Sequence, residues 1–403
     1  MDGAATARLK TYFADLGECL RDKRKRASFA LYATGLLTEG ERKSAEPIAS
    51  RLCGNEDRIG AFHDKLLHFL GQASWDDHAV RLVAARYAIE ALGEREPVTT
   101  WIIDDTGFLK QGKHSVGVQR QYTGSAGKVT NCQVGVSLSV ATRSAHLPID
   151  FELYLPESWT DDPARCKKAK VPDGTKFQTK LDLALKMIER AVRNDIPGDI
   201  VLADCDYGKS PLFRETVRLH GLDYGVGVYS STKVWRLDTL GRRLGEPVTA
   251  AQLAEQLGAS AFRRVSWREG TKGKMSARFC FRRVKLAQDD GLAPADRDST
   301  WLLMEWLDGE KAPTKFLLTS LPRRMSHKQI VRRLHERWRT EQAYEEMKGE
   351  LGLDHYEGRT FVGWHHHVSV VLCCYAFVVT ERTRHFSPSA RRSDPARPLA
   401  LAA

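Results

Sequence analysis

The sequence predicts an α/β protein in which a helical N-terminal region precedes a mixed sheet. Three observations support this fold class. Apolar residues recur at helical spacing through residues 1–93. From about residue 97 the apolar period changes to two, and residues 225–310 are mostly β-like in pattern. With 403 residues the chain is long for one domain, because roughly 150 residues per domain suggests two or three.

The composition favours a polyanionic partner such as nucleic acid. Lys and Arg number 62 against 51 Asp and Glu, a net charge of +11. The longest nearly apolar run, residues 368–379, is too short for a bilayer, which needs about 20 residues. The N-terminus lacks the apolar segment of a secretory signal. We therefore expect a cytoplasmic protein that does not enter a membrane.

The eight cysteines are scattered through the chain and form no CxxC pair. This spacing argues against a disulfide framework and against a structural zinc site built on cysteine. Free thiols in a reducing cytoplasm fit the pattern best.

The N-terminal region predicts helices at residues 9–20, 28–37, 58–70 and 77–92, separated by glycines. The run from Arg21 to Arg26 holds five positive charges in six residues. One interpretation is a solvated helix face. The other is contact with DNA phosphates through Arg24, Lys25 and Arg26, since Lys and Arg supply most non-specific DNA affinity.

The pattern that follows, from about residue 97, predicts the start of a sheet. A β-branched strand at 98–103 ends at Asp104 and Asp105, and the glycines from 107 to 127 mark turns. Strands at 131–140 and 147–155 then form an antiparallel hairpin. A helix at 177–193 leads to a buried strand at 199–203 that ends at Asp204. Another helix follows at 211–219.

The region 225–310 predicts strands, with one short helix at 248–257. The strands lie at 224–229, 233–237, 262–267, 278–285 and 301–307. The tryptophans here are Trp235, Trp267, Trp301 and Trp306. Packing between strands is their default explanation, and stacking on a nucleic-acid base is the alternative.

The C-terminal part predicts a strand at 315–321 and a long helix at 326–348 with Ser326 as its N-cap. Residues 368–379 form a buried helix or strand. The tail from Phe386 lacks periodicity and is expected to be disordered.

Three acids stand out by their positions. Asp104 and Asp204 each close a predicted strand, and Glu341 lies inside the predicted long helix. A carboxylate at the end of an apolar strand is costly unless it is paired or metal-bound. Three converging carboxylates suit Mg²⁺, and two such ions can drive phosphoryl displacement. The simpler alternative is that each acid is a turn residue or a helix N-cap.

The predicted long helix would place Arg337, Glu341, Tyr344 and Lys348 on one face. Glu341 could then hold a metal while its neighbours contact phosphates. An ion-pair ladder on a solvated face is the alternative. The triplet at 365–367 is three consecutive histidines, which point in different directions and do not converge on one ion; a structural or DNA-contact role is expected.

Several stretches resemble the DDE-type transposases of bacterial insertion sequences. IIDDTGFLKQGKHSVGVQRQYTGSAGKVTNCQVGVSLSVAT is similar to their first-Asp region, VLADCDYGKSPLFRE to the second-Asp region, and RWRTEQAYEEMKGELGLDHYEGRTFVGWHHHV to the Glu region. The resemblance covers most of residues 30–380. One branch carries Tyr, two residues, Arg, three residues, Glu, six residues, Lys. Here Arg337, Glu341 and Lys348 match, and Leu334 stands at the Tyr position.

The resemblance implies an RNase H-like core whose metal ligands are Asp104, Asp204 and Glu341. Asp105 is the rival first ligand. Asp206 and Glu345 are weaker candidates for the second and third positions. The expected metal is Mg²⁺, with Mn²⁺ able to substitute. Arg337 and Lys348 would contact DNA phosphates, with Tyr344 on the same helix face.

The resemblance also implies a division of the chain into domains. It implies a helical DNA-binding domain (1–93), a catalytic core in two parts (94–224 and 311–385), a β-rich insertion (225–310) and a disordered tail (386–403). Such an enzyme binds double-stranded DNA at terminal inverted repeats as a homodimer, cleaves there and joins the 3′-OH ends to target DNA. Two alternatives stay open: a related nuclease without strand transfer, and a catalytically inactive DNA-binding descendant.

Overall fold

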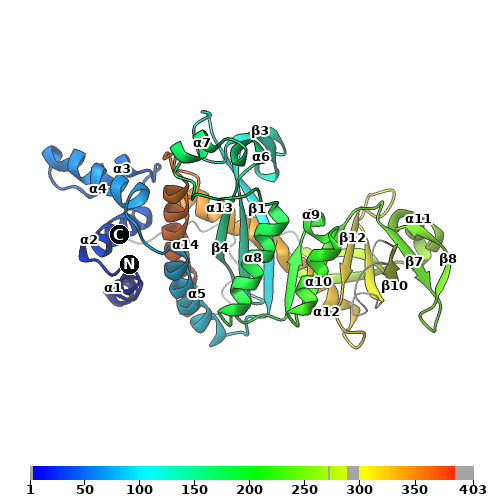
Figure 1. Cartoon of the computed structure of the whole chain (residues 1–403). Coiled ribbons are helices and arrows are strands. Elements are labelled where there is room, and N and C mark those ends of the chain that lie inside the picture. The colour runs from blue at the N-terminus through cyan, green and yellow to red at the C-terminus, as the bar shows by residue number, and fades with distance from the viewer. Residues whose placement is uncertain (1–2, 271–272, 288–298, 386–403) are drawn as a thin grey trace. The chain divides into compact units, whose positions relative to one another are not determined.

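The computed structural model describes residues 3–270, 273–287 and 299–385 (Figure 1). The chain divides into two compact units. The first comprises Met1–Val98, Asp104–Met187 and Arg339–Ala403, and the second Thr99–Ile103 and Ile188–Trp338. Strand β1 (Thr100–Leu109) and helix α8 (Lys180–Arg193) pass from one unit into the other. The tail predicted to be disordered from Phe386 lies outside the described residues.

The N-terminal part of the first unit is helical, as predicted. Its helices are α1 (Gly3–Glu18), α2 (Lys23–Leu37), α3 (Ala45–Leu52), α4 (Ile59–Gly71) and α5 (Asp77–Gly93), with a 3-10 turn at Glu56–Arg58. The sequence missed α3, which has only eight residues. The basic run begins α2, where the Asp22 side chain accepts hydrogen bonds from the backbone N–H groups of Arg24 and Lys25. This cap satisfies two donors that a helix start otherwise leaves unpaired.

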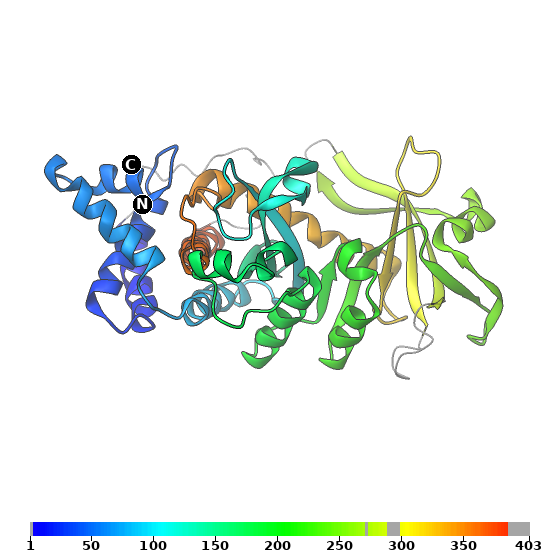
Figure 2. The ribbon, with the colours of Figure 1, turned by 45° about the horizontal axis from the view of Figure 1, so that its top comes forward.

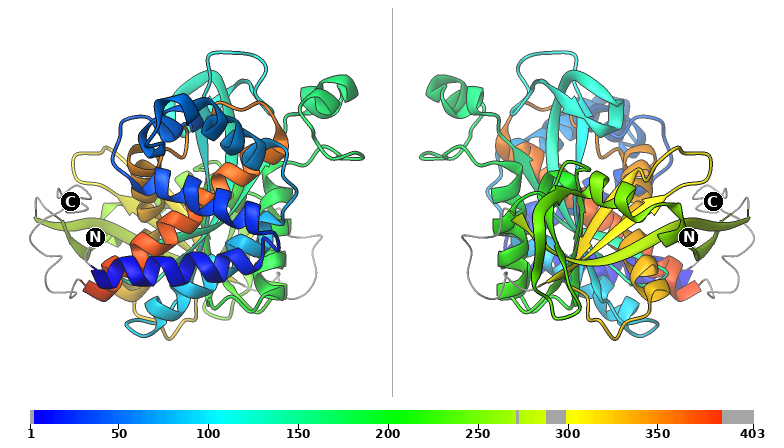
Figure 3. Two further views of the ribbon diagram at one scale, coloured as in Figure 1. Left: turned by 90° about the vertical axis from the view of Figure 1, so that its left-hand side faces the viewer. Right: turned by 90° about the vertical axis from the view of Figure 1, so that its right-hand side faces the viewer.

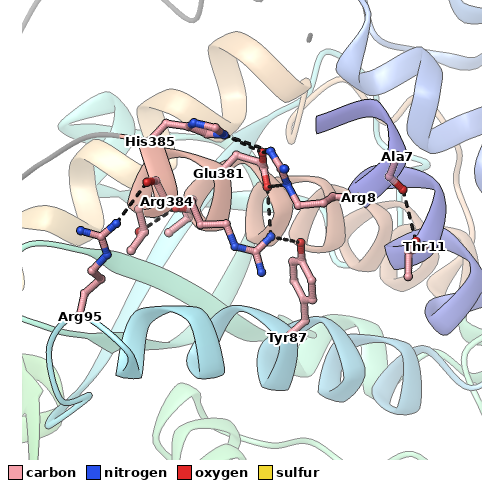
Figure 4. A network of polar contacts seen from close by, with 10 residues as sticks. Ala7, Arg8, Thr11, Tyr87, Arg95, Glu381, Arg384 and His385 are labelled. Carbon is pink, nitrogen blue, oxygen red and sulfur yellow. Dashed lines mark hydrogen bonds and ion pairs between the residues drawn. The ribbon is translucent and has the colours of Figure 1, made fainter. Parts of the chain in front are cut away.

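Helix α14 (Phe361–His385) forms the core of the first unit and contains the predicted buried run 368–379. By length and composition it could cross a membrane, but 94% of its most apolar window is buried inside the protein. It packs against α2, α4, α5 and strand β4, as Figure 3 shows for the helices. Near its C-terminal end, Glu381 accepts two hydrogen bonds from Arg8 at 2.9 and 2.5 Å (Figure 4). α14 is therefore a core helix.

The sheet of the first unit contains the predicted hairpin. Strand β3 (Lys128–Ala141) pairs antiparallel with β2 (Gln119–Thr123) and with β4 (His146–Tyr154), and it neighbours β1. Two short helices, α6 (Glu157–Thr160) and α7 (Pro163–Lys168), follow β4.

The predicted end of the first strand was wrong, because β1 continues through both aspartates to Leu109. The sequence suggested a turn at Gly107. A Cβ at this position would lie 2.1 Å from Thr123 Oγ1, so glycine here permits close approach of a neighbouring strand.

In the second unit, residues 225–310 are mostly β, as predicted. Residues 100–102 of β1 pair in parallel with β5 (Ile200–Ala203), and β5 pairs in parallel with β6 (Asp223–Val228). The ladder then continues antiparallel through β12 (Lys315–Thr319), β11 (Thr300–Trp306), β10 (Gly273–Leu286), β7 (Lys233–Leu237) and β8 (Arg243–Thr249), while β9 (Arg263–Gly270) also pairs with β10. Figure 2 shows β10 and β11 side by side. The helices of this unit are α9 (Cys205–Gly208), α10 (Pro211–Leu219), α11 (Ala250–Leu257) and α12 (His327–Leu334).

The predicted long helix 326–348 is interrupted. Ser326 caps α12 as predicted, but a 3-10 segment at His335–Trp338 separates α12 from α13 (Arg339–Leu351). Glu336 in this segment is buried and accepts a hydrogen bond from Thr100 Oγ1 at 2.8 Å. The His335 ring N–H donates to the Val331 carbonyl at 2.8 Å. The His335 ring thus bonds to a carbonyl that regular helical hydrogen bonding uses, and no sequence breaker marks the interruption.

Candidate active site

Asp104 lies in the middle of β1, not at its end as the sequence suggested. It is 8% exposed, and its Oδ1 accepts a hydrogen bond from the backbone N–H of Asp105 at 2.9 Å. A carboxylate this deeply placed in a strand requires compensating interactions. Asp104 is therefore held within the sheet rather than in a flexible turn.

The two neighbouring aspartates face opposite sides of the strand. On one side, Lys348 Nζ of α13 donates to Thr106 Oγ1 at 2.9 Å and lies 5.6 Å from the Phe108 ring centre. On the other side, Asp105 pairs with Lys180 of α8 at 2.9 Å. Successive side chains alternate between the faces of a strand, so Asp104 shares the face of Thr106 and Phe108. The structure thus favours Asp104 over Asp105 as the acid directed toward α13.

Glu341 is exposed and lies in the first turn of α13, which corrects the expectation of a central position in a long helix. It precedes Lys348 by seven residues, so both share one helix face. The neighbouring Thr340 is buried and lies 3.0 Å from His146 Nε2 of β4. Within the first unit, Lys348 thus joins the α13 face that carries Glu341 to β1, the strand that carries Asp104. Glu345, the alternative acid, is also exposed.

Lys348 and Tyr344 are held by intramolecular contacts. Lys348 Nζ also donates to the Gly107 carbonyl at 2.8 Å, and burial lowers the pKa of its ammonium group. The Tyr344 hydroxyl lies 2.5 Å from Ser137 Oγ in the core. The structure therefore places Tyr344 in packing against β3, although the sequence suggested a DNA contact.

Asp204 lies in the second unit and ends β5. Its Oδ1 accepts a hydrogen bond from the backbone N–H of Asp206 at 2.9 Å, so the side chain also caps the short helix α9. Asp206 is exposed and bonds to Lys209 Nζ at 3.1 Å and to the Tyr229 hydroxyl at 2.7 Å. The N-cap alternative considered for Asp204 is thus present, and it uses one of the two carboxylate oxygens.

Arg337 lies near the Asp204 loop within the second unit. Burial raises the pKa of the Cys205 thiol, Asp204 and Asp206 raise it further, and the positive charge of Arg337 lowers it. Arg337 is thus close enough to act electrostatically on the residue after Asp204. Leu334, which stands at the Tyr position of the signature, is 6% exposed. Its Cδ2 packs so closely on Gly225 that a Cβ added to this glycine would lie only 2.2 Å away.

The basic run of α2 is only partly available to a ligand. Arg24 and Arg26 are exposed, while Lys25 donates to the Ser74 carbonyl at 2.5 Å. The four cations that begin α2, residues 23–26, are electrostatically unfavourable there, because a helix N-terminus carries the positive end of the helix dipole. An anionic partner would relieve this repulsion.

Each tryptophan of the β-rich region has an intramolecular partner. Arg243, Arg283 and Arg278 lie over Trp235, Trp301 and Trp306 at 5.0, 5.2 and 4.3 Å from the ring centres, and Trp267 lies 4.3 Å from the His335 ring centre. These contacts agree with the packing interpretation.

The structure contains a second group of possible metal ligands that the sequence did not predict. His78, Asp150 and Glu152 offer ligand atoms that all lie within 4.8 Å of one another. Asp150 and Glu152 alternate within the apolar segment 147–155, and two acids on one face of a buried strand were a signal that could have indicated this group.

Comparison with known proteins agrees with the geometry. Residues 15–274 match the family model described as DDE superfamily endonuclease, which is more than half of the chain. The protein belongs to this family, and the resemblance seen in the sequence is confirmed. The matched range contains Asp104 and Asp204 and ends before Glu341. Membership implies an RNase H-like core and a divalent metal.

A curated relative extends the comparison. A probable transposase for insertion sequence element IS701 from Microchaete diplosiphon is 29% identical over 189 residues. The match covers 47% of this chain and 45% of that protein. The chain therefore spans about half the length of this relative.

Proposed function

We propose that the protein is a Mg²⁺-dependent DNA transposase, with Asp104, Asp204 and Glu341 as its metal ligands. The observation that carries the proposal is the direction of Asp104 toward the α13 face that bears Glu341, in a chain of the DDE superfamily. Carboxylate oxygens are the donors that Mg²⁺ and Mn²⁺ prefer, so the residue types fit a hard divalent ion. We place the enzyme in the bacterial cytoplasm, where it meets DNA.

The parallel ladder between β1 and β5 supports the inclusion of Asp204. Its register pairs Ile102 with Leu202. Asp104 follows Ile102 by two residues within β1, and Asp204 follows Leu202 by two residues, just beyond the end of β5.

The proposed reaction has two in-line displacements. Water attacks a phosphodiester at the transposon end and frees a 3′-OH, which then attacks a phosphodiester of the target DNA. When bound, two divalent ions activate the attacking oxygen and stabilise the leaving oxygen. The three acids would supply oxygen ligands. Lys348 would position the site, because its bonds to Thr106 and Gly107 tie α13 to β1.

The remaining basic residues would bind the DNA backbone. Arg24 and Arg26 are exposed at the start of α2, and Arg337 lies near the Asp204 loop. The net charge of +11 favours this role. Recognition of terminal inverted repeats by the helical N-terminal region, and action as a homodimer that holds two ends, complete the proposal.

The test uses the full chain with labelled fragments from the element's two boundaries, a target plasmid and Mg²⁺. We expect nicking at the boundary and joined product, both abolished by Asp104→Asn, Asp204→Asn or Glu341→Gln. Asp105→Asn is the matched control, since it makes the same chemical change one residue away on the opposite face. It should retain both activities.

Other outcomes would replace the proposal. Nicking without joining by the unmodified chain would indicate a nuclease, and binding without nicking would indicate an inactive DNA-binding descendant. Loss of activity in Asp105→Asn but not in Asp104→Asn would assign the first ligand to Asp105.

A further inference from the structure

A buried polar cluster joins α5, β4 and α14 within the first unit, on elements that pack against one another (Figure 1). Its members are Asp77, His78 and Arg81 of α5, Asp150 and Glu152 of β4, and His365 of α14. Asp150 and Glu152 flank Phe151, whose ring meets Tyr344 of α13. By strand alternation, the cluster thus lies on the other side of β4 from that contact.

His365 is oriented as a metal ligand would be. Its Nδ1 lies 3.0 Å from the Phe361 carbonyl, which only accepts hydrogen bonds, so Nδ1 carries the proton. The lone pair is then on Nε2, which is buried without a hydrogen-bond partner among the described residues. It faces Glu152 Oε2 at 3.7 Å, and the residue is 6% exposed. A neutral His365 ring thus turns its lone pair toward the Glu152 carboxylate, an arrangement that a bound cation would stabilise.

The other oxygen of Glu152 faces a second histidine. Oε1 lies 3.8 Å from His78 Nε2, and the ligand atoms of His78, Asp150 and Glu152 lie within 4.8 Å of one another. Ligand bonds of about 2.0–2.1 Å in a tetrahedron place neighbouring ligand atoms roughly 3.3 Å apart. The separations among these three residues therefore need only a small contraction around an ion; His365 contacts the group through Glu152.

The charges of the cluster favour a divalent cation. Arg81 contacts Asp77 Oδ2 at 2.7 Å and Asp150 Oδ1 at 3.2 Å. The cluster thus combines three carboxylic acids with one guanidinium and two imidazoles.

We propose that His78, Asp150, Glu152 and His365 bind one Zn²⁺ ion that is structural and separate from the proposed catalytic metals. Imidazole nitrogen with carboxylate oxygen suits zinc, whereas Mg²⁺ prefers oxygen alone. Four protein ligands fill a tetrahedral site, and the hydrogen bond from His365 to the Phe361 carbonyl fixes the orientation of the imidazole ring, as is typical of histidine ligands. The ion would fasten α5 and α14 to β4.

Zinc binding requires one local adjustment. His78 would coordinate through Nε2 and carry its proton on Nδ1, which now lies 2.5 Å from Arg81 Nη2. Arg81 would turn toward Asp150, which it already contacts. The His78 side chain is 41% exposed and gives the ion a route from solvent.

The test measures zinc in the full chain after EDTA treatment, incubation with zinc chloride and removal of free ion. We expect one zinc per chain in the parent protein and in a protein carrying Asp104→Asn and Glu341→Gln, which separates this site from the proposed catalytic one. Glu152→Gln, His365→Gln and His78→Gln should each lower zinc affinity at least tenfold. His114→Gln, a control at an exposed histidine, should not.

A second measurement, the melting temperature, distinguishes loss of zinc binding from loss of folding. Saturating zinc should raise the melting temperature of the parent and of His114→Gln, but not of Glu152→Gln. If circular dichroism shows that His365→Gln is unfolded, the half-exposed His78→Gln decides. Zinc content well below one per chain in the parent, or equal content in parent, Glu152→Gln and His78→Gln, would overturn the proposal.

Discussion

Acid should destabilise the first unit through His146, a buried histidine of β4. This residue is 7% exposed, and its Nε2 lies 3.0 Å from Thr340 Oγ1, next to Glu341. Burial, with a smaller effect from Arg339, lowers its pKa to about 3. The neutral ring is thus the form that the folded protein accommodates.

The sign and size follow from linkage. In the unfolded chain the pKa is about 6.5, so below that pH the unfolded state binds a proton that the folded state refuses. The contribution of His146 is complete above pH 6.5 and is lost as pH falls toward 3. One pKa unit equals about 1.4 kcal/mol, so at pH 5 the loss is about 2 kcal/mol.

The assay compares urea unfolding of the parent and of His146→Gln at pH 8 and pH 5, both with EDTA. His366 and His367 also have lowered pKa values, but they are common to both proteins and cancel in the comparison. The parent should lose about 2 kcal/mol more than the variant between the two pH values. Equal losses in the two proteins would refute the reasoning, because a buried neutral His146 requires a difference.

Three further predictions follow from the packing and the charges. Leu334→Tyr restores the family signature, but it should destabilise the chain by about 1–3 kcal/mol through overpacking against Gly225. Leu334→Met should destabilise the chain less. An unchanged melting temperature in Leu334→Tyr would contradict this prediction. Tyr344→Phe should cost about 1 kcal/mol in urea unfolding through loss of the Ser137 hydrogen bond, with DNA affinity in a filter-binding assay unchanged. Arg24→Gln combined with Arg26→Gln should weaken DNA binding and reduce the slope of log affinity against log salt by about 2, and an unchanged slope would place DNA elsewhere.

Local patterns were sufficient for elements whose determinants lie close together in the chain. Alternating apolar residues predicted β3 and β4 as an antiparallel pair, and Ser326 is the N-cap predicted for this helix, where it forms a capping box with Gln329 at the start of α12. The predicted helix at 211–219 is likewise present as α10, which begins at Pro211 directly after its N-cap Ser210. Neighbouring residues provide most of the stabilising contacts at such features.

Tertiary contacts explain where the sequence failed. Strand β1 continues past two aspartates because Lys180 neutralises Asp105 from a helix 75 residues away. The long helix breaks at His335 because Glu336 is buried against Thr100, a partner 236 residues away. Neither partner can be identified from local periodicity, which carries no information about distant residues.

The candidate site was also predicted from the sequence only in part. The motif spacing predicted Asp104, Asp204 and Glu341 as the site, but it could not separate Asp104 from Asp105, since both fit within one position. Strand direction favours Asp104, because Thr106 and Phe108 on its face meet Lys348. The same spacing suggested Tyr344 as a DNA contact, yet its hydroxyl meets Ser137 in the core.

The three consecutive histidines connect the sequence reasoning to the proposed zinc site. As predicted, they diverge: His365 faces Glu152, His366 meets the Leu70 carbonyl, and His367 lies between Tyr32 and the Gly352 carbonyl. Because the three side chains point in different directions, they do not share one ion. One of these histidines can still bind an ion together with ligands from distant parts of the chain. Because α14 passes β4, the first histidine meets acids that precede it by more than 200 residues. The nitrogen ligands of this cluster and the all-oxygen ligands proposed around Asp104 select different metals, so both sites can be filled in one chain without competition.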